Sequence, residues 1–174
     1  MTMEERIKAA AVDMEPELKK VKIARSLSQD STAFTAQLWV DGEYIADVSN
    51  DGRGGNNRIM HRFDGKGLNT RDKVQAFRKW CEGQPPRTIA VNDAPGAKTA
   101  SVAMDADLYI SLMLEDYEEQ QQIKRWCKTK TVIRLKSDKP GEFHIYKKVY
   151  DPAFAQRIRD KEPTLVEILN ERYL

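Results

Sequence analysis

The feature that most constrains the fold of this chain is a strand–turn–strand pattern in residues 34–49. In the run FTAQLWV, apolar and polar side chains alternate, as they do in a strand with one buried face. The Asp41-Gly42 pair that follows is preferred in two-residue type I′ turns, where both residues have positive φ. The sequence therefore predicts an antiparallel hairpin, which pairs Leu38 with Ile45 and Trp39 with Tyr44.

The rest of the sequence combines helical stripes with short strand-like runs. An apolar stripe predicts a helix over residues 70–82, and the Asp151-Pro152 pair is typical of a helix start. Pro140-Gly141 is a strong turn signal between two further strands. The predicted elements are a helix at 2–14, strands at 21–27, 33–40, 44–49 and 58–63, helices at 70–82 and 105–128, strands at 131–136 and 143–149, and helices after Asp151 and after the capping box of Thr164 and Glu167, with an irregular connection at 87–101.

Strands that are joined by turns rather than by helical crossovers favour the α+β class. We therefore expect an antiparallel sheet built from two hairpins and packed against several helices. The two hairpins either share one sheet or define two subdomains. A length of 174 residues fits a single domain spanning residues 1–174, with a subdomain seam expected near residues 85–96 if there is one.

Cysteine usage and hydropathy indicate a reducing compartment. Cys81 and Cys127 each lie beside a tryptophan in a helical pattern, which is typical of buried free thiols. No apolar run approaches the ~18 residues that a membrane span requires. The N-terminal run MTMEERIKAA lacks the apolar core of a signal peptide. We expect a cytoplasmic protein without membrane partners.

The first candidate site is the glycine-rich loop SNDGRGGNNR at residues 49–58. Main-chain amides in such a loop can cradle an anion, and neighbouring arginines add positive charge. The loop lacks the ending of a P-loop, and no helix opens directly after it as in a dinucleotide fingerprint. The alternative is a loop that needs glycine only for its path. The predicted ligand-binding residues are Asn50, Asp51, Gly52, Arg53, Gly54, Gly55 and Arg58.

The second candidate site follows from an uneven charge distribution. Residues 105–123 contain acidic but no basic residues, whereas residues 124–161 hold 12 basic residues against 4 acidic ones. These segments either neutralise each other or leave a basic patch for a phosphate or an acidic partner. Lysines interleaved with aromatic residues are typical of nucleic-acid binders, although lysines also protect edge strands. The predicted nucleic-acid-binding residues are Lys128, Lys130, Arg134, Lys136, Tyr146 and Lys148.

Signatures of catalysis, metal binding and cofactor binding are weak. The two histidines, His61 and His144, lie far apart in the sequence, and no Ser-His-Asp or Cys-His set can be assembled. His61 and Asp64 alone are a weak signal for a metal site. We therefore expect no catalytic residue, no metal and no cofactor. A phosphate- or nucleotide-handling enzyme that uses the glycine loop is the alternative.

Three stretches of the chain resemble a family of uncharacterised small proteins of phages and prophage-like elements. They are SLSQDSTAFTAQLWVDGEYIADVSNDGRGG, KRWCKTKTVIRLKSDKPGEF and EILNERYL. Family members carry a histidine in the glycine motif where this sequence has Arg53. The resemblance implies a setting in the host cytoplasm rather than a particular activity. The leading hypothesis is a non-enzymatic protein that binds a host protein or a phosphate-bearing ligand, as in counter-defence, and the alternative is nucleic-acid binding through the basic hairpin.

Overall fold

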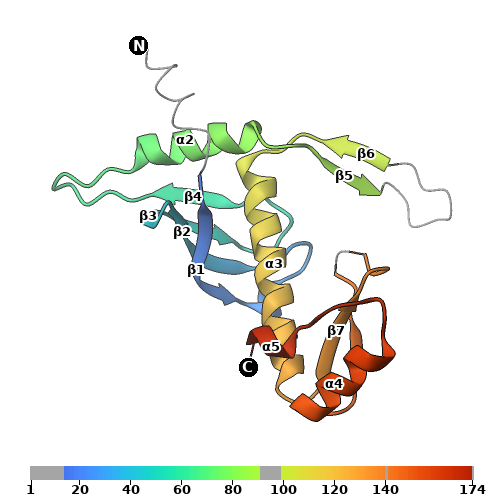
Figure 1. The fold of residues 1–174 in the computed structure, drawn as a ribbon. Helices are drawn as coiled ribbons and strands as arrows, with labels where there is room; N and C mark the ends of the chain where they lie inside the picture. The colour runs from blue at the N-terminus through green and yellow to red at the C-terminus, as the bar shows by residue number, and fades with distance from the viewer. Residues whose placement is uncertain (1–13, 91–98, 140, 174) are drawn as a thin grey trace. The chain divides into compact units, whose positions relative to one another are not determined.

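The computed structural model describes residues 14–90, 99–139 and 141–173 (Figure 1). The helix predicted at 2–14 therefore lies almost entirely outside the described residues. The chain forms two compact units, Met1–Leu114 and Glu115–Leu174. The division falls inside the longest helix, α3 (Ala106–Cys127), and the seam predicted near residues 85–96 lies within the first unit. Helices and antiparallel sheets together make this an α+β fold, as predicted.

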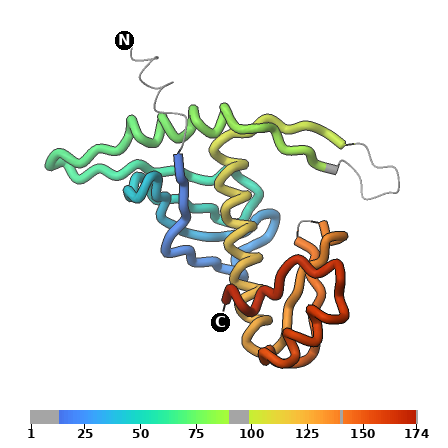
Figure 2. Tube along the Cα trace, viewed as in Figure 1, coloured from blue at the N-terminus to red at the C-terminus, as the bar shows by residue number. Residues whose placement is uncertain are grey.

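The first unit is built on a four-stranded antiparallel sheet in the order β1-β2-β3-β4. Figure 2 traces the chain through this unit, from blue towards green with increasing residue number. The strands are β1 (Pro16–Ile23), β2 (Phe34–Val40), β3 (Glu43–Asn50) and β4 (Arg58–His61). One face of the sheet packs on helix α2 (Arg71–Glu82) and on the first turns of α3. The core between them consists of inward residues of β2 and β3 together with Val74, Phe77, Trp80, Cys81, Ala106, Ile110 and Leu114.

The predicted hairpin is confirmed, with one correction to its register. Asp41 and Gly42 have φ of 52° and 77°, as a type I′ turn requires. Trp39 pairs with Tyr44 as predicted, but Leu38 pairs with Ala46 instead of Ile45. Ile45 is the extra residue of a bulge, and its carbonyl accepts from the Arg62 amide and from the hydroxyl of Thr70 instead of pairing with β2.

The strand predicted at 21–27 is wrong in position. The strand β1 runs from Pro16 to Ile23 and is followed by a short 3-10 turn, η1 (Arg25–Leu27). Its pairing with β2 shifts register between Lys19 and Lys22, where Lys20 has a φ of 51°. This irregularity breaks the apolar alternation that would have marked the strand in the sequence.

The connection at 87–101, predicted to be irregular, contains a further hairpin of the first unit. Strand β5 (Arg87–Ala90) pairs with β6 (Thr99–Val102) in a separate two-stranded sheet. Residues 91–98, between these two strands, lie outside the described residues. Each strand has only four residues, so neither carries enough alternation to be recognised.

The second unit contains a three-stranded antiparallel sheet in the order β8-β7-β9. The predicted second hairpin is present as β7 (Thr131–Leu135) and β8 (His144–Tyr146), so the two hairpins belong to different sheets. Helix α4 (Pro152–Lys161) begins as predicted, with the Asp151 carboxylate accepting from the Phe154 amide. The central strand β7 is buried on both faces, with Val132 in one apolar cluster and Ile133 in another.

The helix predicted after Thr164 is wrong for most of its length. Residues Leu165–Ile168 form strand β9, which pairs with β7, and only Asn170–Tyr173 form a short helix, α5. The pairing of β9 with β7 prevails over a local capping signal, because a helix there would leave one edge of β7 without a partner. No helix in the described parts of the chain is both long and apolar enough to span a bilayer.

Candidate functional site

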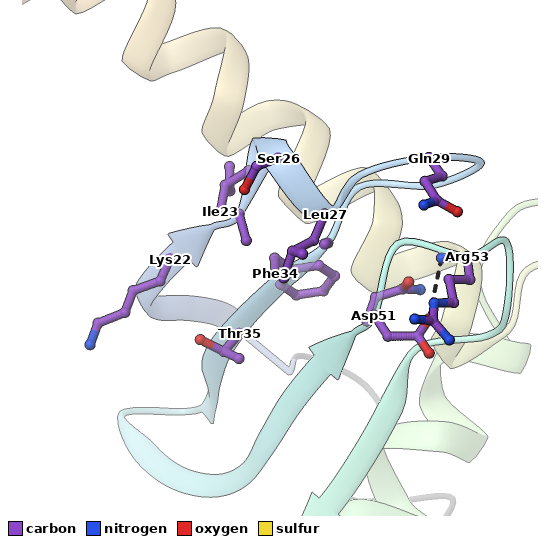
Figure 3. Close-up of a pocket in the computed structure, with 12 residues that line it drawn as sticks. Lys22, Ile23, Ser26, Leu27, Gln29, Phe34, Thr35, Asp51 and Arg53 are labelled. Carbon is purple, nitrogen blue, oxygen red and sulfur yellow. Dashed lines mark hydrogen bonds between the residues drawn. The ribbon is translucent and has the colours of Figure 1, made fainter.

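A pocket of about 520 Å³ lies in the first unit, where β1 ends, β2 begins and the glycine loop leaves β3 (Figure 3). We call it the loop pocket. Its apolar part includes Ile23 and Leu27, and Leu27 is 61% exposed although it is a large apolar side chain. The full lining is Lys22, Ile23, Ala24, Ser26, Leu27, Gln29, Ala33, Phe34, Thr35, Asn50, Asp51 and Arg53.

Gly52 fixes the wall of the loop pocket. Its carbonyl accepts from the amides of Gln29, Asp30 and Ser31, at 2.9, 3.1 and 3.3 Å. Its φ is +81°, and a Cβ atom at this position would lie 2.5 Å from the carbonyl oxygen of Leu27. Only glycine can therefore bring the loop this close to the η1 turn.

Asn50 organises the start of the glycine loop. Its side-chain oxygen accepts from the Gly52 amide at 2.9 Å and from the Ser31 hydroxyl at 2.9 Å. Its side-chain nitrogen donates to the Gly55 carbonyl at 2.9 Å. The Ser31 hydroxyl in turn accepts from the Gly54 amide at 3.1 Å. One asparagine thus holds both ends of the turn, which makes the loop a defined structure rather than an open span.

These contacts argue against the prediction that main-chain amides of the glycine loop bind an anion. The amides of Gly52, Arg53, Gly54 and Asn57 already donate to oxygens of the first unit. An anion that enters the loop pocket would therefore be held by side chains rather than by a row of these amides. The two cationic side chains that line the pocket are Lys22 and Arg53, and Asp51 is its acidic one.

The structure brings together only part of the predicted ligand-binding set. Asn50, Asp51 and Arg53 line the loop pocket, and Gly52 shapes its wall from a buried position. Gly54, Gly55 and Arg58 do not line it, and Arg58 begins strand β4. The wall formed by Lys22, Leu27 and Gln29 was not predicted, because these residues precede the glycine loop by twenty or more positions and form no motif of their own.

The basic hairpin of the second unit does not present its predicted residues on one open face. Tyr146 packs edge to face on Phe154 of α4, with ring centroids 5.5 Å apart. Arg134 pairs with Glu167 at 3.3 Å, and Lys148 pairs with Asp151 at 3.2 Å. Lys128 and Lys136 are exposed, whereas Lys130 is half-buried and its carbonyl accepts from Asn170.

No group of three or more His, Cys, Asp or Glu side chains that could hold a metal ion occurs among the residues that the structure describes. Comparison of the chain with known proteins finds no matching family model, no matching curated protein and no matching solved structure. The functional argument therefore rests on the loop pocket itself.

Proposed function

We propose that the first unit binds a small phosphate-bearing ligand in the loop pocket. The observation that carries this proposal is that two cationic side chains from distant segments, Lys22 and Arg53, line the same pocket, one at each end (Figure 3). Neither cation forms an ion pair with a carboxylate of the described residues. A cation without a carboxylate partner among the described residues is available to an anionic ligand, and phosphate oxygens accept charge-assisted hydrogen bonds from lysine and arginine side chains.

The other lining residues suit a ligand with a body as well as a phosphate. A volume of about 520 Å³ is within the range of small-molecule pockets, roughly 300–1,000 Å³. The exposed Leu27 and neighbouring Ile23 offer apolar contact, and Gln29 offers an amide group for hydrogen bonds. The resemblance to phage and prophage proteins supports testing ligands that are abundant in a host cell, and nucleoside monophosphates are the first probes.

Calorimetric titration with nucleoside monophosphates and the matching nucleosides tests the proposal. We expect the monophosphates to bind more tightly than the nucleosides, by about tenfold or more, because each charge-assisted hydrogen bond contributes roughly 1.5–3 kcal/mol. Arg53→Ala and Lys22→Ala should each weaken monophosphate binding by a similar factor. Lys20→Ala is the matched lysine control on the same strand, and Arg71→Ala is an exposed arginine control; neither residue lines the pocket.

Equal affinity for nucleosides and monophosphates, or no effect of Arg53→Ala, would overturn the proposal. The same mixtures with added magnesium also test whether the protein is an enzyme. Chromatography at successive times measures how much of the nucleotide has been converted. Conversion of the nucleotide that disappears in Arg53→Ala would make the loop pocket a catalytic site instead of a binding site.

A further inference from the structure

The two edges of the four-stranded sheet are protected to different degrees. The β1 edge carries Lys19, Lys20 and Lys22 and a register irregularity, and both lysines and irregularities discourage pairing with another strand. The β4 edge pairs with β3 in an unbroken register from Arg58 to His61. In the described structure β4 lies at the end of the strand order, without a further strand beside it (Figure 1).

The main-chain groups that β4 directs to its open edge can be identified from its pairing. The Arg62 amide donates to the carbonyl of Ile45, on the β3 side, at 3.3 Å. Hydrogen-bonding groups alternate along an antiparallel strand, so residues 58 and 60 also face β3, and Ile59 and His61 face the open edge. No described residue outside the strands forms a main-chain hydrogen bond with Ile59 or His61. The open edge of β4 therefore has two free main-chain positions, Ile59 and His61, at the spacing with which a neighbouring strand forms hydrogen bonds.

Exposed apolar side chains flank this open edge. Met60 is 63% exposed and Phe63, just beyond the strand, is 69% exposed. Phe63 has no aromatic or cation–π partner among the described residues. Scattered single apolar residues are common on surfaces, but aromatic and methionine side chains beside an unpaired strand are enriched at interfaces.

The charge around β4 selects the kind of partner. Strand β4 and the two residues after it carry Arg58, His61 and Arg62 and no acidic residue, and Arg58 forms no ion pair with the described residues. The acidic residue opposite Met60 on β3, Asp47, accepts a hydrogen bond from the Tyr44 hydroxyl. A second copy of the same strand would bring these basic side chains together, in either direction of pairing. An extended segment with acidic and apolar side chains would instead match both the charge and the exposed Met60 and Phe63.

We propose that the β4 edge binds an extended acidic and apolar segment of a partner protein, which adds to the sheet as a fifth strand. Main-chain hydrogen bonds to Ile59 and His61 would provide the pairing, and Arg58, Met60 and Phe63 would provide the preference for acidic and apolar side chains. This inference is independent of the loop pocket, since none of the residues that line the pocket belongs to β4.

Selection from a display library of random dodecapeptides on the immobilised protein tests the inference. We expect the enriched peptides to alternate acidic and apolar residues. In the complex with an enriched peptide, hydrogen exchange at the amides of Ile59 and His61 should slow by at least about tenfold relative to the free protein, because both become hydrogen-bonded. Met60→Ala and Arg58→Glu should each weaken peptide binding at least about tenfold.

Lys20→Glu, on the opposite edge, is the matched control and should leave peptide binding unchanged. All three substituted side chains are exposed, and an unchanged urea midpoint shows that each variant folds. Enriched peptides without acidic residues, protection of β1 amides instead of β4 amides, or unaltered binding to Met60→Ala would overturn the inference. So would a stable dimer of the protein that Met60→Ala dissociates, because the occupant would then be a second copy. Loss of nucleotide binding by Arg53→Ala with intact peptide binding distinguishes the two sites.

Discussion

The carboxylate of Asp107 on α3 accepts a hydrogen bond of 2.6 Å from the main-chain amide of Asn57, fifty residues earlier in the chain. The side-chain amide of Asn57 donates back to the Asp107 carbonyl at 3.1 Å and to the Ser111 hydroxyl at 3.0 Å. The far end of the glycine loop is thus fixed to a helix turn. Asn50 holds the near end, so both ends of the loop have defined positions.

Removal of the Asp107 carboxylate should loosen the loop and lower stability. We expect Asp107→Ala to reduce the free energy of unfolding by about 1–3 kcal/mol, because the half-buried Asn57 amide loses its acceptor. Asp107→Asn keeps an oxygen at the same place and should cost less than half as much. Urea denaturation at pH 7 measures both. Equal losses in the two variants would contradict the role given to this hydrogen bond.

Gly52 should be the least replaceable glycine of the loop. We expect Gly52→Ala to cost about 2–5 kcal/mol, because it combines a strained φ with a clash against the Leu27 carbonyl and the Ala33 side chain. Gly55→Ala is the matched control, since a Cβ there meets no atom within 4 Å and its φ is not in the left-handed region. Thermal unfolding of the two variants provides the comparison. Similar melting temperatures for both would show that the close approach at Gly52 is not needed.

Asn170 should be essential for the second unit. It is fully buried, accepts from the Val132 amide at 2.8 Å, and donates to the carbonyls of Cys127 and Lys130 at 3.1 and 2.7 Å. Asn170→Leu would leave these three main-chain groups without partners, so we expect a loss of about 3 kcal/mol or more. Gln120→Ala, an exposed control in the same unit, should change stability by less than about 0.5 kcal/mol. Hydrogen exchange at the Val132 amide would report the local opening.

Acid should destabilise the second unit through two aspartates. Hydrogen bonds from the Leu135 amide and from His144 lower the pKa of Asp138, and hydrogen bonds from the Phe154 amide and Lys148 lower the pKa of Asp151. A lowered pKa in the folded state means that the unfolded chain binds a proton more readily. The stabilisation is therefore present above the unfolded pKa of about 3.9 and is lost as the pH falls through the lower folded value.

Urea midpoints measured between pH 7 and pH 2.5 test this dependence. Asp138→Asn and Asp151→Asn should each be less stable than the parent chain at pH 7 and should lose less stability on acidification. A parent midpoint that stays constant below pH 4, or variants with the same slope as the parent chain, would contradict the assignment.

The two thiols should be unreactive in the folded protein. Both cysteines are free and buried, as predicted from their helical stripes. Burial raises the pKa of Cys81 to about 12 and also raises the pKa of Cys127, so almost no thiolate is present at pH 8. We expect a thiol reagent such as dithionitrobenzoate to react with neither thiol in buffer. Both thiols should react in about 6 M guanidinium, which unfolds most domains. Fast reaction of one thiol in buffer would mean that its surroundings open readily.

Local patterns predicted the parts of the fold in which one short segment decides the structure. The Asp41-Gly42 turn, the apolar stripe of α2 and the Asp151 cap of α4 are all encoded within a few residues, and the structure has each of them. Thr70 directly precedes α2, but its hydroxyl donates to the Ile45 carbonyl instead of capping the helix. Here a long-range hydrogen bond uses the hydroxyl of a residue at a helix start, where a threonine side chain usually caps the helix.

The features that could not be predicted depend on contacts between distant segments. Strand β9 carries a helical capping signal and becomes a strand only because β7 lies beside it. The glycine motif marked Asn50, Asp51 and Arg53, but nothing in the sequence indicated that Lys22 and Leu27 would complete the pocket. The hydrogen bond between the Asn57 amide and Asp107 could not be predicted either, since no local pattern relates residues 57 and 107.

The burial of β7 on both faces determines when the second unit can assemble during synthesis. Val132 and Ile133 enter separate apolar clusters, and those clusters need Leu169 and Ile168, respectively, for completion. A nascent chain that has emerged only as far as α4 therefore exposes a strand with one bare edge and two incompletely covered faces. Until residues 165–170 leave the ribosome, the bare edge of β7 is open to pairing with other chains unless a chaperone covers it.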